Sequence, residues 1–321
     1  MIVKEATESI KIVRLKEILK RISPTHLKRN ELEGELARSH AGFRGEQSLF
    51  YHLDLLPHDD CFIFHDLRIP HKSSFFQLDI LILTPTFFLI IEVKNMAGTL
   101  IFDQEFNQLH RILNGIEETF ADPVSQIYRQ TFLFKEWLNN QRLPKIPIES
   151  LIIISNPHTR IKSIPDKTNL SKMVTHSSNL LPRFHRFLHM HNKEIMTKKE
   201  IKKLSRLLLK QHTQNSSDLF EQFSISENNL IKGVPCPNCE SIPMIRKKRQ
   251  WFCEKCFLFS KDAHVEALKT YRILFGPRIT NSQCRDFLKL SSRHTTKHLL
   301  RSLHLPESGL GKYKNYELLN F

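Results

Sequence analysis

The sequence has no long hydrophobic run. Its longest apolar stretches are Ile80–Leu83 and Phe87–Ile91, far below the ~18–20 residues that a helix needs to cross a bilayer. The N-terminal segment carries charges every few residues and lacks the uninterrupted apolar stretch of a secretory signal. With 40% hydrophobic and 25% charged residues, a wholly disordered or fibrous chain is also excluded. We therefore expect a cytoplasmic globular protein with reduced thiols and no membrane partner.

Negative charge is scarce, and its distribution is uneven. The chain has 48 Lys and Arg against 33 Asp and Glu, a net charge of +15. Residues 36–150 have a net charge of −4, whereas residues 151–229 carry +7 and residues 230–321 carry +10. A basic field of this size attracts phosphate polymers or anionic membranes. Because no apolar-faced amphipathic segment accompanies the C-terminal charge, we expect nucleic acid as the partner, with DNA favoured and RNA left open.

Internal repeats are also absent, and the chain is read as a series of different segments. Thr197 and Glu200 form a capping-box pattern that predicts a helix to about Lys210. The polar stretch that follows is rich in Ser, Asn and Gln, which is typical of a linker. The expected regions are an N-terminal helical extension (1–35), an α/β domain (36–155), a basic helical extension (156–210), a linker (211–229), a cysteine-paired module (230–262) and a basic, helix-turn-helix-like C-terminal domain (263–321).

The most informative segment is residues 77–95, QLDILILTPTFFLIIEVKN. Two apolar, β-branched runs flank Thr84-Pro85-Thr86 and predict a hairpin, in which Asp79 lies opposite Glu92. Lys94 shares a strand face with Glu92. Two facing carboxylates repel in an apolar sheet, and a divalent cation, Mg²⁺ by its oxygen ligands, removes that penalty. This set suits metal-assisted phosphodiester hydrolysis, although a surface hairpin with solvated charges at its ends is an equal alternative.

A third carboxylate precedes this segment. Gly45-Glu46 is expected to open a helix whose apolar stripe is Leu49, Phe50, Leu53 and Leu56, with Glu46 projecting from the same side. There it can complete the shell of a cation. The alternative is a Glu in the first turn that interacts favourably with the helix dipole.

In this order, Gly45-Glu46, Asp79, Glu92-Val-Lys94 and Asp122-Pro123-Val-Ser-Gln126 resemble the nuclease-related domain (NERD) family. That family is grouped with the PD-(D/E)XK restriction-endonuclease-like superfamily. The resemblance implies an α/β fold with a mixed sheet flanked by helices. It also implies Glu46, Asp79 and Glu92 as Mg²⁺ ligands, Lys94 as the catalytic lysine, and Gln126 as a residue that supports the site or meets DNA. Asp122 departs from the Asn expected before the proline, but it still caps a helix.

Four of the six cysteines form two closely spaced pairs, Cys236/Cys239 and Cys253/Cys256, with 13 residues between the pairs. Each pair can offer two thiolates to one tetrahedral ion, so the pattern resembles a closed, structural zinc ribbon. Between the pairs lie basic and aromatic side chains that suit phosphate contact and base stacking: Arg246, Lys247, Lys248, Arg249 and Trp251. A solvated turn with aromatic packing is the alternative. Cys61 and Cys284 are expected to be buried thiols.

The C-terminal segment predicts two short helices within residues 279–305, separated by Lys289-Leu290-Ser291. Arg293 and Lys297 make the start of the second helix basic, as in a helix-turn-helix that meets the major groove. Residues 309–316 can form a wing. A winged-helix-like tail and a small helical cap with a solvated basic face both remain open.

The leading hypothesis is a Mg²⁺-dependent nuclease acting on DNA, positioned by a zinc ribbon and a basic tail. The alternatives are a non-catalytic DNA-binding protein with a structural acidic cluster, and a regulatory adaptor that binds a protein partner. Oligomeric state is left open by the sequence.

Overall fold

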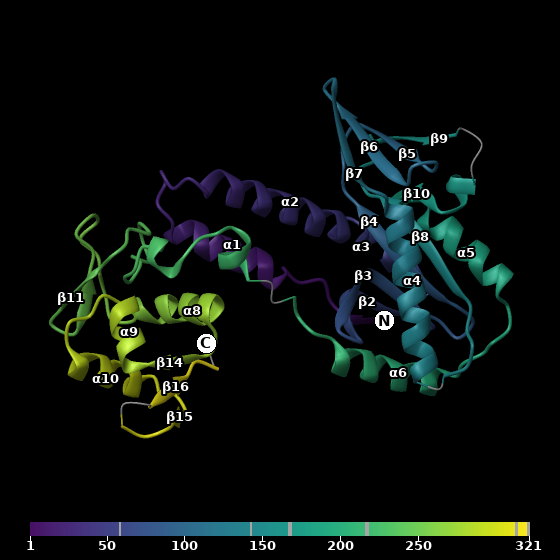
Figure 1. Ribbon diagram of the computed structural model, residues 1–321. Coiled ribbons are helices and arrows are strands. Elements are labelled where there is room, and N and C mark those ends of the chain that lie inside the picture. Colours follow the sequence, from purple (N-terminus) through teal and green to yellow (C-terminus); the bar gives the residue numbers. More distant parts are fainter. Residues whose placement is uncertain (58, 142, 166–168, 216–217, 312–313, 320–321) are drawn as a thin grey trace. The chain divides into compact units, whose positions relative to one another are not determined.

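The computed structural model describes residues 1–321 except 58, 142, 166–168, 216–217, 312–313 and 320–321 (Figure 1). The chain forms two compact units, each built from two segments. Unit 1 contains Met1–Glu8 and Arg38–Asn215, and unit 2 contains Ser9–Ala37 and Ser216–Phe321. Among the described residues, no helix combines the length and the apolar character that crossing a membrane requires.

Unit 1 is built on a mixed six-stranded sheet in the order β1-β2-β3-β4-β8-β10. The pairs β1/β2, β4/β8 and β8/β10 are parallel, and β2/β3 and β3/β4 are antiparallel. The strands are β1 (Ile2–Lys4), β2 (Phe62–His71), β3 (Ser74–Leu83), β4 (Phe88–Lys94), β8 (Ile148–Ile154) and β10 (Val174–His176). Nearly every residue of β4 is buried, as expected for a strand covered on both faces.

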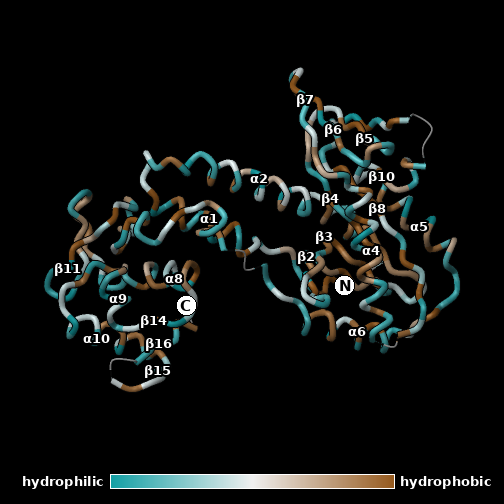
Figure 2. The backbone as a smooth tube through the Cα atoms, in the orientation of Figure 1, coloured by the Kyte–Doolittle hydropathy of each residue, from teal (hydrophilic) through white to brown (hydrophobic). Residues whose placement is uncertain are grey.

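Helices cover both faces of this sheet. One apolar core contains residues of α4 (Pro123–Asn140) and α6 (Lys198–Gln211). The other contains residues of α5 (Leu180–Met190) and of the segment around α3 (Phe50–Asp54). Figure 2 shows the strands as the most hydrophobic part of the unit, with polar segments outside them. The predicted α/β fold, with a mixed sheet flanked by helices, is therefore confirmed.

Unit 1 also contains a smaller sheet, whose four strands lie between β4 and β10 in the sequence. Its order is β7-β6-β5-β9, with β5/β9 parallel and the other pairs antiparallel. Two short 3₁₀ helices, η1 (Asn169–Lys172) and η2 (Ser177–Asn179), precede α5. The strands are β5 (Thr99–Asp103), β6 (Gln108–Leu113), β7 (Ile116–Ala121) and β9 (Arg160–Ile164).

The helix around Gly45-Glu46 differs from expectation. These residues do not open a helix; they lie in the last turn of α2 (Arg29–Gln47), and α3 begins separately at Phe50. The expected stripe is nevertheless buried at Leu49, Leu53 and Leu56. Gly45 lies where α2 comes close to Asn95: a Cβ at this position would lie 2.6 Å from the Cβ of Asn95.

Unit 2 begins with α1 (Ile10–Arg21), which Ser9 caps. Within the stretch expected to be a linker, α7 (Leu219–Gln222) and η3 (Glu227–Asn229) occur, and Leu219 and Phe223 are buried in this unit. Residues 216–217 of that stretch lie outside the described residues. The cysteine module contributes the three-stranded sheet β11 (Ile245–Lys247), β12 (Gln250–Phe252) and β13 (Phe259–Ser260).

The C-terminal segment has the order helix, strand, helix, helix, strand, strand, and β16 lies between β14 and β15 in its sheet. Both predicted helices are present, and this arrangement is winged-helix-like. Lys312 and Tyr313, at the predicted wing, lie outside the described residues. The elements are α8 (His264–Phe275), β14 (Arg278–Thr280), α9 (Asn281–Phe287), α10 (Arg293–Ser302), β15 (Glu307–Ser308) and β16 (Asn315–Glu317).

Candidate functional site

The β3–β4 hairpin brings the carboxylate of Asp79 to the main chain of β4. The strands pair with Ile80 opposite Ile91, which confirms the predicted register. Regular pairing ends there, and at the next step Asp79 accepts a hydrogen bond from the N–H of Val93 at 2.9 Å. The side chain thus takes the acceptor role that a main-chain carbonyl has in a regular ladder.

Glu92 is buried, with 2% of its surface exposed. Its Oε1 accepts hydrogen bonds from Nζ of Lys94 and from Nε2 of Gln126, both at 2.7 Å. Its Oε2 accepts from Nε2 of Gln130 at 2.9 Å, and Lys94 also donates to Oε1 of Gln126 at 3.0 Å. A buried carboxylate is expensive unless it is paired and hydrogen-bonded. One ammonium and two amides meet that requirement here.

Helix α4 supplies both glutamines. Asp122 caps it as predicted, accepting from the N–H of Val124 at 3.1 Å and of Ser125 at 2.8 Å. Gln126 and Gln130 are four residues apart, so they project from the same side of the helix. Gln130 was not among the predicted site residues, yet its side chain is buried and contacts Glu92 as directly as Gln126 does. Its helical spacing from Gln126 was the available signal.

Glu46 comes to the same region from the end of α2. The close approach of Gly45 to Asn95 allows the helix to pack against the end of β4, where Nδ2 of Asn95 donates to the carbonyl of Ala41 at 2.8 Å. Glu46 therefore lies in a last turn, where the helix dipole disfavours a negative charge. The alternative explanation of Glu46, a first-turn Glu that interacts favourably with the helix dipole, is therefore wrong.

The carboxylates affect one another electrostatically. Burial raises the pKa of Glu46 to about 8, with the charges of Asp66 and Glu92 adding to the effect and Lys4 opposing it. Burial, then Glu92 and Glu46, raises the pKa of Asp79 well above its ordinary range, against the Val93 N–H and Lys94. Both acids thus favour a proton, and a divalent cation in its place would relieve the burial and repulsion together.

The three predicted ligands are not gathered as tightly as a closed metal site. Among the described residues, only the four cysteines form a group of three or more His, Cys, Asp or Glu side chains whose ligand atoms all lie within 4.8 Å. Mg²⁺ is commonly held by one or two carboxylates, with waters and substrate phosphates as the other ligands. Asp79 and Glu46 fit such a set. Glu92 fits it as well, because its three donors fill three of the four lone-pair sites of the carboxylate and leave one on Oε2.

Two further charged residues reach this region, and the sequence analysis did not single them out. Asp66 and Asp79 occupy facing positions on β2 and β3, between the pairs His65–Ile80 and Leu67–Leu78. Lys4, on β1, donates from Nζ to the carbonyl of His65 at 2.8 Å. Its positive charge lowers the pKa of Glu46 and of Asp66. An Asp in the apolar run FIFHDLRI was a usable signal for Asp66, whereas nothing local marked Lys4.

The four paired cysteines meet in unit 2. Sγ of Cys236 lies 3.5 Å from that of Cys256, and Sγ of Cys239 lies 3.5 Å from that of Cys253. All four are within zinc-binding distance of one another. Cys61 and Cys284 are buried and free, as expected.

The two cysteine turns have the same backbone geometry. The N–H of Glu240 donates to the carbonyl of Cys236, and the N–H of Phe257 donates to the carbonyl of Cys253, both at 2.9 Å. Each donor residue has a positive φ, 57° for Glu240 and 59° for Phe257. Each turn therefore folds both of its thiols toward one point, so the set suits a single tetrahedral ion with no open position.

The basic residues between the cysteine pairs lie in different surroundings. Lys248 and Arg249 are exposed at the β11–β12 turn, where both have positive φ values of 43° and 68°. Arg246 lies over the ring of Trp251, and Lys247 lies over that of Phe252. Trp251 is completely buried. Its ring has no face open to a base, so we leave Trp251 out of the proposed nucleic-acid contacts.

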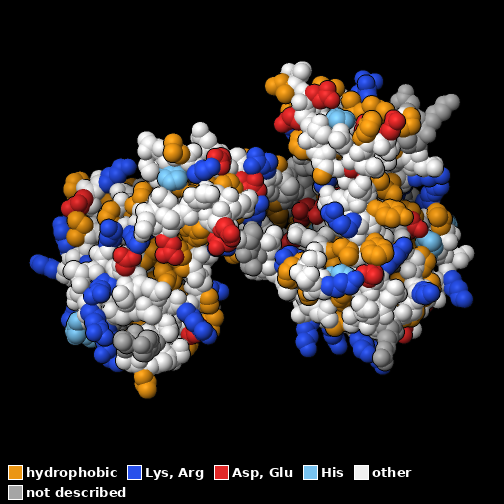
Figure 3. All heavy atoms as spheres, viewed as in Figure 1, with side chains coloured by type: hydrophobic (Ala, Val, Ile, Leu, Met, Phe, Trp, Pro, Cys, Tyr) orange, Lys and Arg blue, Asp and Glu red, His pale blue; other side chains and the backbone are white. Residues whose placement is uncertain are grey.

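Arg293 and Lys297 are exposed on α10 and are four residues apart. They share one side of the helix with Arg301. Figure 3 shows Lys, Arg and His side chains gathered over this helix. The basic stripe expected from the sequence is therefore present at the surface of unit 2.

These features define a class of protein: an α/β domain with an acidic, lysine-containing cluster at the end of a hairpin, followed by a four-cysteine module. Residues 41–155 match the nuclease-related domain family, which belongs to the PD-(D/E)XK superfamily. The match covers about a third of the chain and contains Glu46, Asp79, Glu92, Lys94 and both glutamines. Comparison with curated proteins and with solved structures found no match.

Proposed function

We propose that the protein is a Mg²⁺-dependent nuclease that hydrolyses phosphodiester bonds of DNA. The observation that supports this most is the network at the end of β4, in which Lys94 is held by Glu92 and Gln126 beside Asp79. The match of residues 41–155 to a nuclease-related domain supports the same reading.

Glu46, Asp79 and Glu92 would hold the cation, which when bound polarises the phosphoryl oxygen and lowers the pKa of water. Lys94 orients the attacking water through its Nζ and, in its neutral form, takes up the proton that this water loses. Gln126 fixes that nitrogen through its Oε1, 3.0 Å away. Gln130 fixes the other oxygen of Glu92 and so keeps the carboxylate from rotating.

Unit 2 supplies affinity in this proposal. The four cysteines hold Zn²⁺, which stabilises a module too small to fold on its apolar core alone. Arg246, Lys247, Lys248 and Arg249 on the ribbon, and Arg293 and Lys297 on α10, contact phosphates and release counterions.

The test is cleavage of labelled DNA with and without added Mg²⁺, using purified full-length protein. Asp79→Asn and Lys94→Ala should each lower the rate by about 100-fold or more. Lys135→Ala, on the exposed side of α4 in the same unit, is the matched control and should leave the rate unchanged. Thermal unfolding of each variant checks that the fold persists.

Metal-independent cleavage, or full cleavage by folded Asp79→Asn and Lys94→Ala, would contradict the proposal. Running single-stranded RNA beside DNA in the same assay decides between the two substrates.

One observation favours the non-catalytic alternative. Both oxygens of Glu92 already accept hydrogen bonds from Lys94, Gln126 and Gln130, so the burial of this carboxylate is compensated without a cation. A structural cluster predicts DNA binding without cleavage, together with a large loss of stability in Glu92→Gln that added Mg²⁺ does not change.

A further inference from the structure

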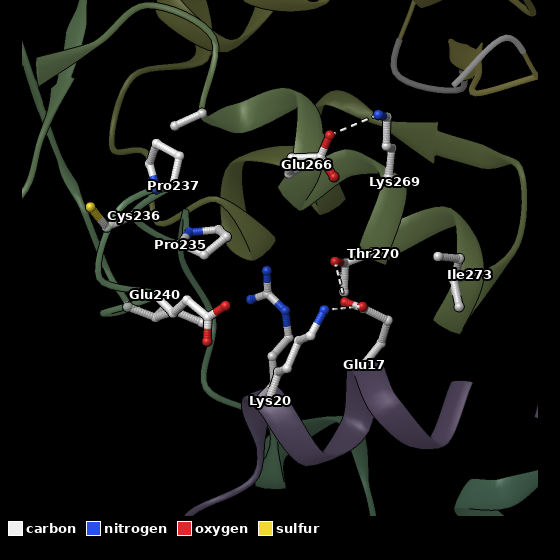
Figure 4. Close-up of a pocket in the computed structure, with 13 residues that line it drawn as sticks. Glu17, Lys20, Pro235, Cys236, Pro237, Glu240, Glu266, Lys269, Thr270 and Ile273 are labelled. Carbon is white, nitrogen blue, oxygen red and sulfur yellow. Dashed lines mark hydrogen bonds and ion pairs between the residues drawn. The ribbon is translucent and has the colours of Figure 1, made fainter. Parts of the chain in front are cut away.

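Two hollows in unit 2 differ in how their charges are compensated. One, of about 340 Å³, lies between α1 and α8 (Figure 4). Its acids and bases pair with one another: Lys20 donates to Glu17, and Lys269 donates to Glu266, both at 2.7 Å. The hydroxyl of Thr270 also donates to Glu17, at 2.6 Å. The charges of these side chains are balanced within the hollow.

The second hollow has a volume of about 760 Å³ and lies between the β11–β12 hairpin and α10. We call it the hairpin hollow. Of the described residues that line it, four are Lys or Arg, three are His and none is Asp or Glu. No acid of its own lining therefore balances this positive charge.

Two side chains of the hairpin hollow carry hydrogen-bond donors without acceptors. Among the described residues, Nε and Nη1 of Arg246 have no partner although both atoms are buried, and Nε2 of His264 has none either. His264 is only 6% exposed. A buried donor without an acceptor costs free energy, and three such atoms in one lining indicate a missing acceptor.

The tautomer of His264 makes this argument stronger. Its Nδ1 accepts a hydrogen bond from the indole N–H of Trp251 at 3.2 Å. Burial lowers the pKa of His264 to about 4, with Arg246 adding to the effect and Asp262 opposing it, so the ring is neutral near pH 7. A neutral ring that accepts at Nδ1 carries its proton at Nε2. The unpaired atom is therefore a donor.

The rim of the hairpin hollow is basic and exposed. Lys248 and Arg249 form the hairpin tip, with φ values that favour Asn or Gly over long side chains. On the opposite wall, His294 and His298 stand one helical turn apart on α10, with ring centroids 4.5 Å apart. The buried donors of Arg246 and His264 thus lie below a rim of exposed cationic or polar groups.

We propose that the hairpin hollow is a phosphate-binding pocket that holds a backbone phosphate of a nucleic-acid strand. A phosphate oxygen accepts several hydrogen bonds at once, and the planar guanidinium of Arg246 suits two of them. The hollow is far larger than one phosphate group, and its positive rim extends beyond the buried donors. A strand with flanking charges therefore matches it better than a free inorganic anion. The inference does not depend on whether the carboxylate site of unit 1 cleaves.

The two tryptophans of the chain provide a direct measurement. The indole N–H of Trp251 donates to His264 in the pocket, whereas that of Trp137 donates to Gln211 in unit 1, 2.9 Å away. In ¹H–¹⁵N spectra of the full-length, zinc-loaded protein without magnesium, a short single-stranded DNA should shift the Trp251 signal. The Trp137 signal, identified with Trp137→Phe, should stay in place and is the internal control.

Variants test the lining. Arg246→Lys keeps the charge but loses the planar fork, and Arg249→Ala removes a rim charge; each should weaken binding of labelled DNA by about 10-fold, as for one charge-assisted hydrogen bond. Lys269→Ala is the matched control, because this lysine of the same unit pairs with Glu266 in the other hollow and does not line the hairpin hollow. It should weaken binding by about 2-fold or less. Unchanged zinc content confirms that each variant is folded.

The outcomes separate the possibilities. A Trp251 shift with DNA, at concentrations where inorganic phosphate and a mononucleotide give none, supports the proposal. Shifts at equal concentrations of DNA and inorganic phosphate contradict the assignment to a strand. Absence of any Trp251 shift, or equal weakening by Lys269→Ala and Arg249→Ala, would overturn the pocket.

Discussion

The candidate sites of the two units differ in the kind of partner that they lack. In unit 1, acids are drawn into a sheet and raise one another's pKa, so the region is short of positive charge. In unit 2, Arg246 and His264 present buried donors, so the region is short of an acceptor. Each deficit indicates a ligand of complementary charge: a cation in the first unit and a phosphate in the second. The proposed ligands, Mg²⁺ and a phosphate ester of DNA, would satisfy both.

The largest difference between the units should be their dependence on metal. Cys253→Ser removes one of four thiolates, and structural zinc contributes on the order of 10 kcal/mol in small zinc modules. We expect loss of zinc and unfolding of the ribbon, with a sharp loss of DNA binding, while the melting transition of unit 1 is kept. Zinc content and circular dichroism during heating measure both effects.

Cys284→Ser is the control for that experiment, because Cys284 is a buried thiol of the same unit outside the four-cysteine group. It should retain one zinc per chain. Equal zinc content in Cys253→Ser and in the wild type would refute the closed four-thiolate site.

The second prediction concerns pH and belongs to unit 1. Glu46 has a pKa of about 8 in the folded state against an ordinary value of 4.5, so the folded state binds this proton more tightly than the unfolded state. Stability should therefore fall as the pH rises from about 4.5 to 8 and level off above that. Glu46→Gln removes the part of this dependence that Glu46 contributes and leaves the part due to the raised pKa of Asp79. Without divalent ions it should be more stable than the wild type at pH 8.5 by a few kcal/mol.

Denaturant titrations at pH 4.5 and pH 8.5 measure that difference. Near pH 4.5 the variant and the wild type should have similar free energies of unfolding. Added Mg²⁺ should stabilise the wild type at pH 8.5 more than the variant, since a ligand bound only by the folded state adds to its stability. A wild type that loses no stability between the two pH values would contradict the raised pKa.

The third prediction separates the two glutamines. Gln126→Leu removes one of the two acceptors that hold Lys94 and one of the two donors to Oε1 of Glu92. The cleavage rate should therefore fall by about 10- to 100-fold with little change in KM. Gln130→Leu leaves Lys94 in place but removes the hydrogen-bond donor to Oε2 of Glu92 and to the carbonyl of Gln77. It should lower stability by about 1–3 kcal/mol and the rate by less. Similar losses of rate and stability in both variants would show that the residues act as one structural unit.

How far the sequence specifies these sites depends on the range of the contacts. The register of β3 and β4 followed from a short turn at Thr84-Pro85-Thr86, where Thr84 accepts from and donates to Phe87. Local capping likewise gave the starts of α4 and α6. The cysteine cluster followed from spacing, because each pair lies within a single turn.

Long-range contacts account for what was missed. Lys4 reaches the acids because β1 pairs in parallel with β2, about sixty residues later, and no local pattern marks that pairing. The predicted start of the helix that contains Glu46 was wrong. Gly45 looks like a helix boundary in the sequence, whereas in the fold it lies within α2, where the helix comes close to Asn95. Trp251 was predicted to stack on a base, but it is completely buried, and its indole N–H donates to His264.

The smallest expected effect concerns α10. Arg293→Ala and Lys297→Ala each remove one exposed charge that reaches a phosphate without lining the hairpin hollow. Each should reduce the slope of log K against log salt concentration by about 1 and weaken binding about equally for all sequences. Anisotropy titrations of labelled DNA at several salt concentrations measure the slope, with Lys135→Ala in unit 1 as the control of equal charge. An unchanged slope in both α10 variants would confine the phosphate contacts of unit 2 to the ribbon, and would leave α10 as a wall of the pocket whose exposed basic stripe makes no contact with DNA.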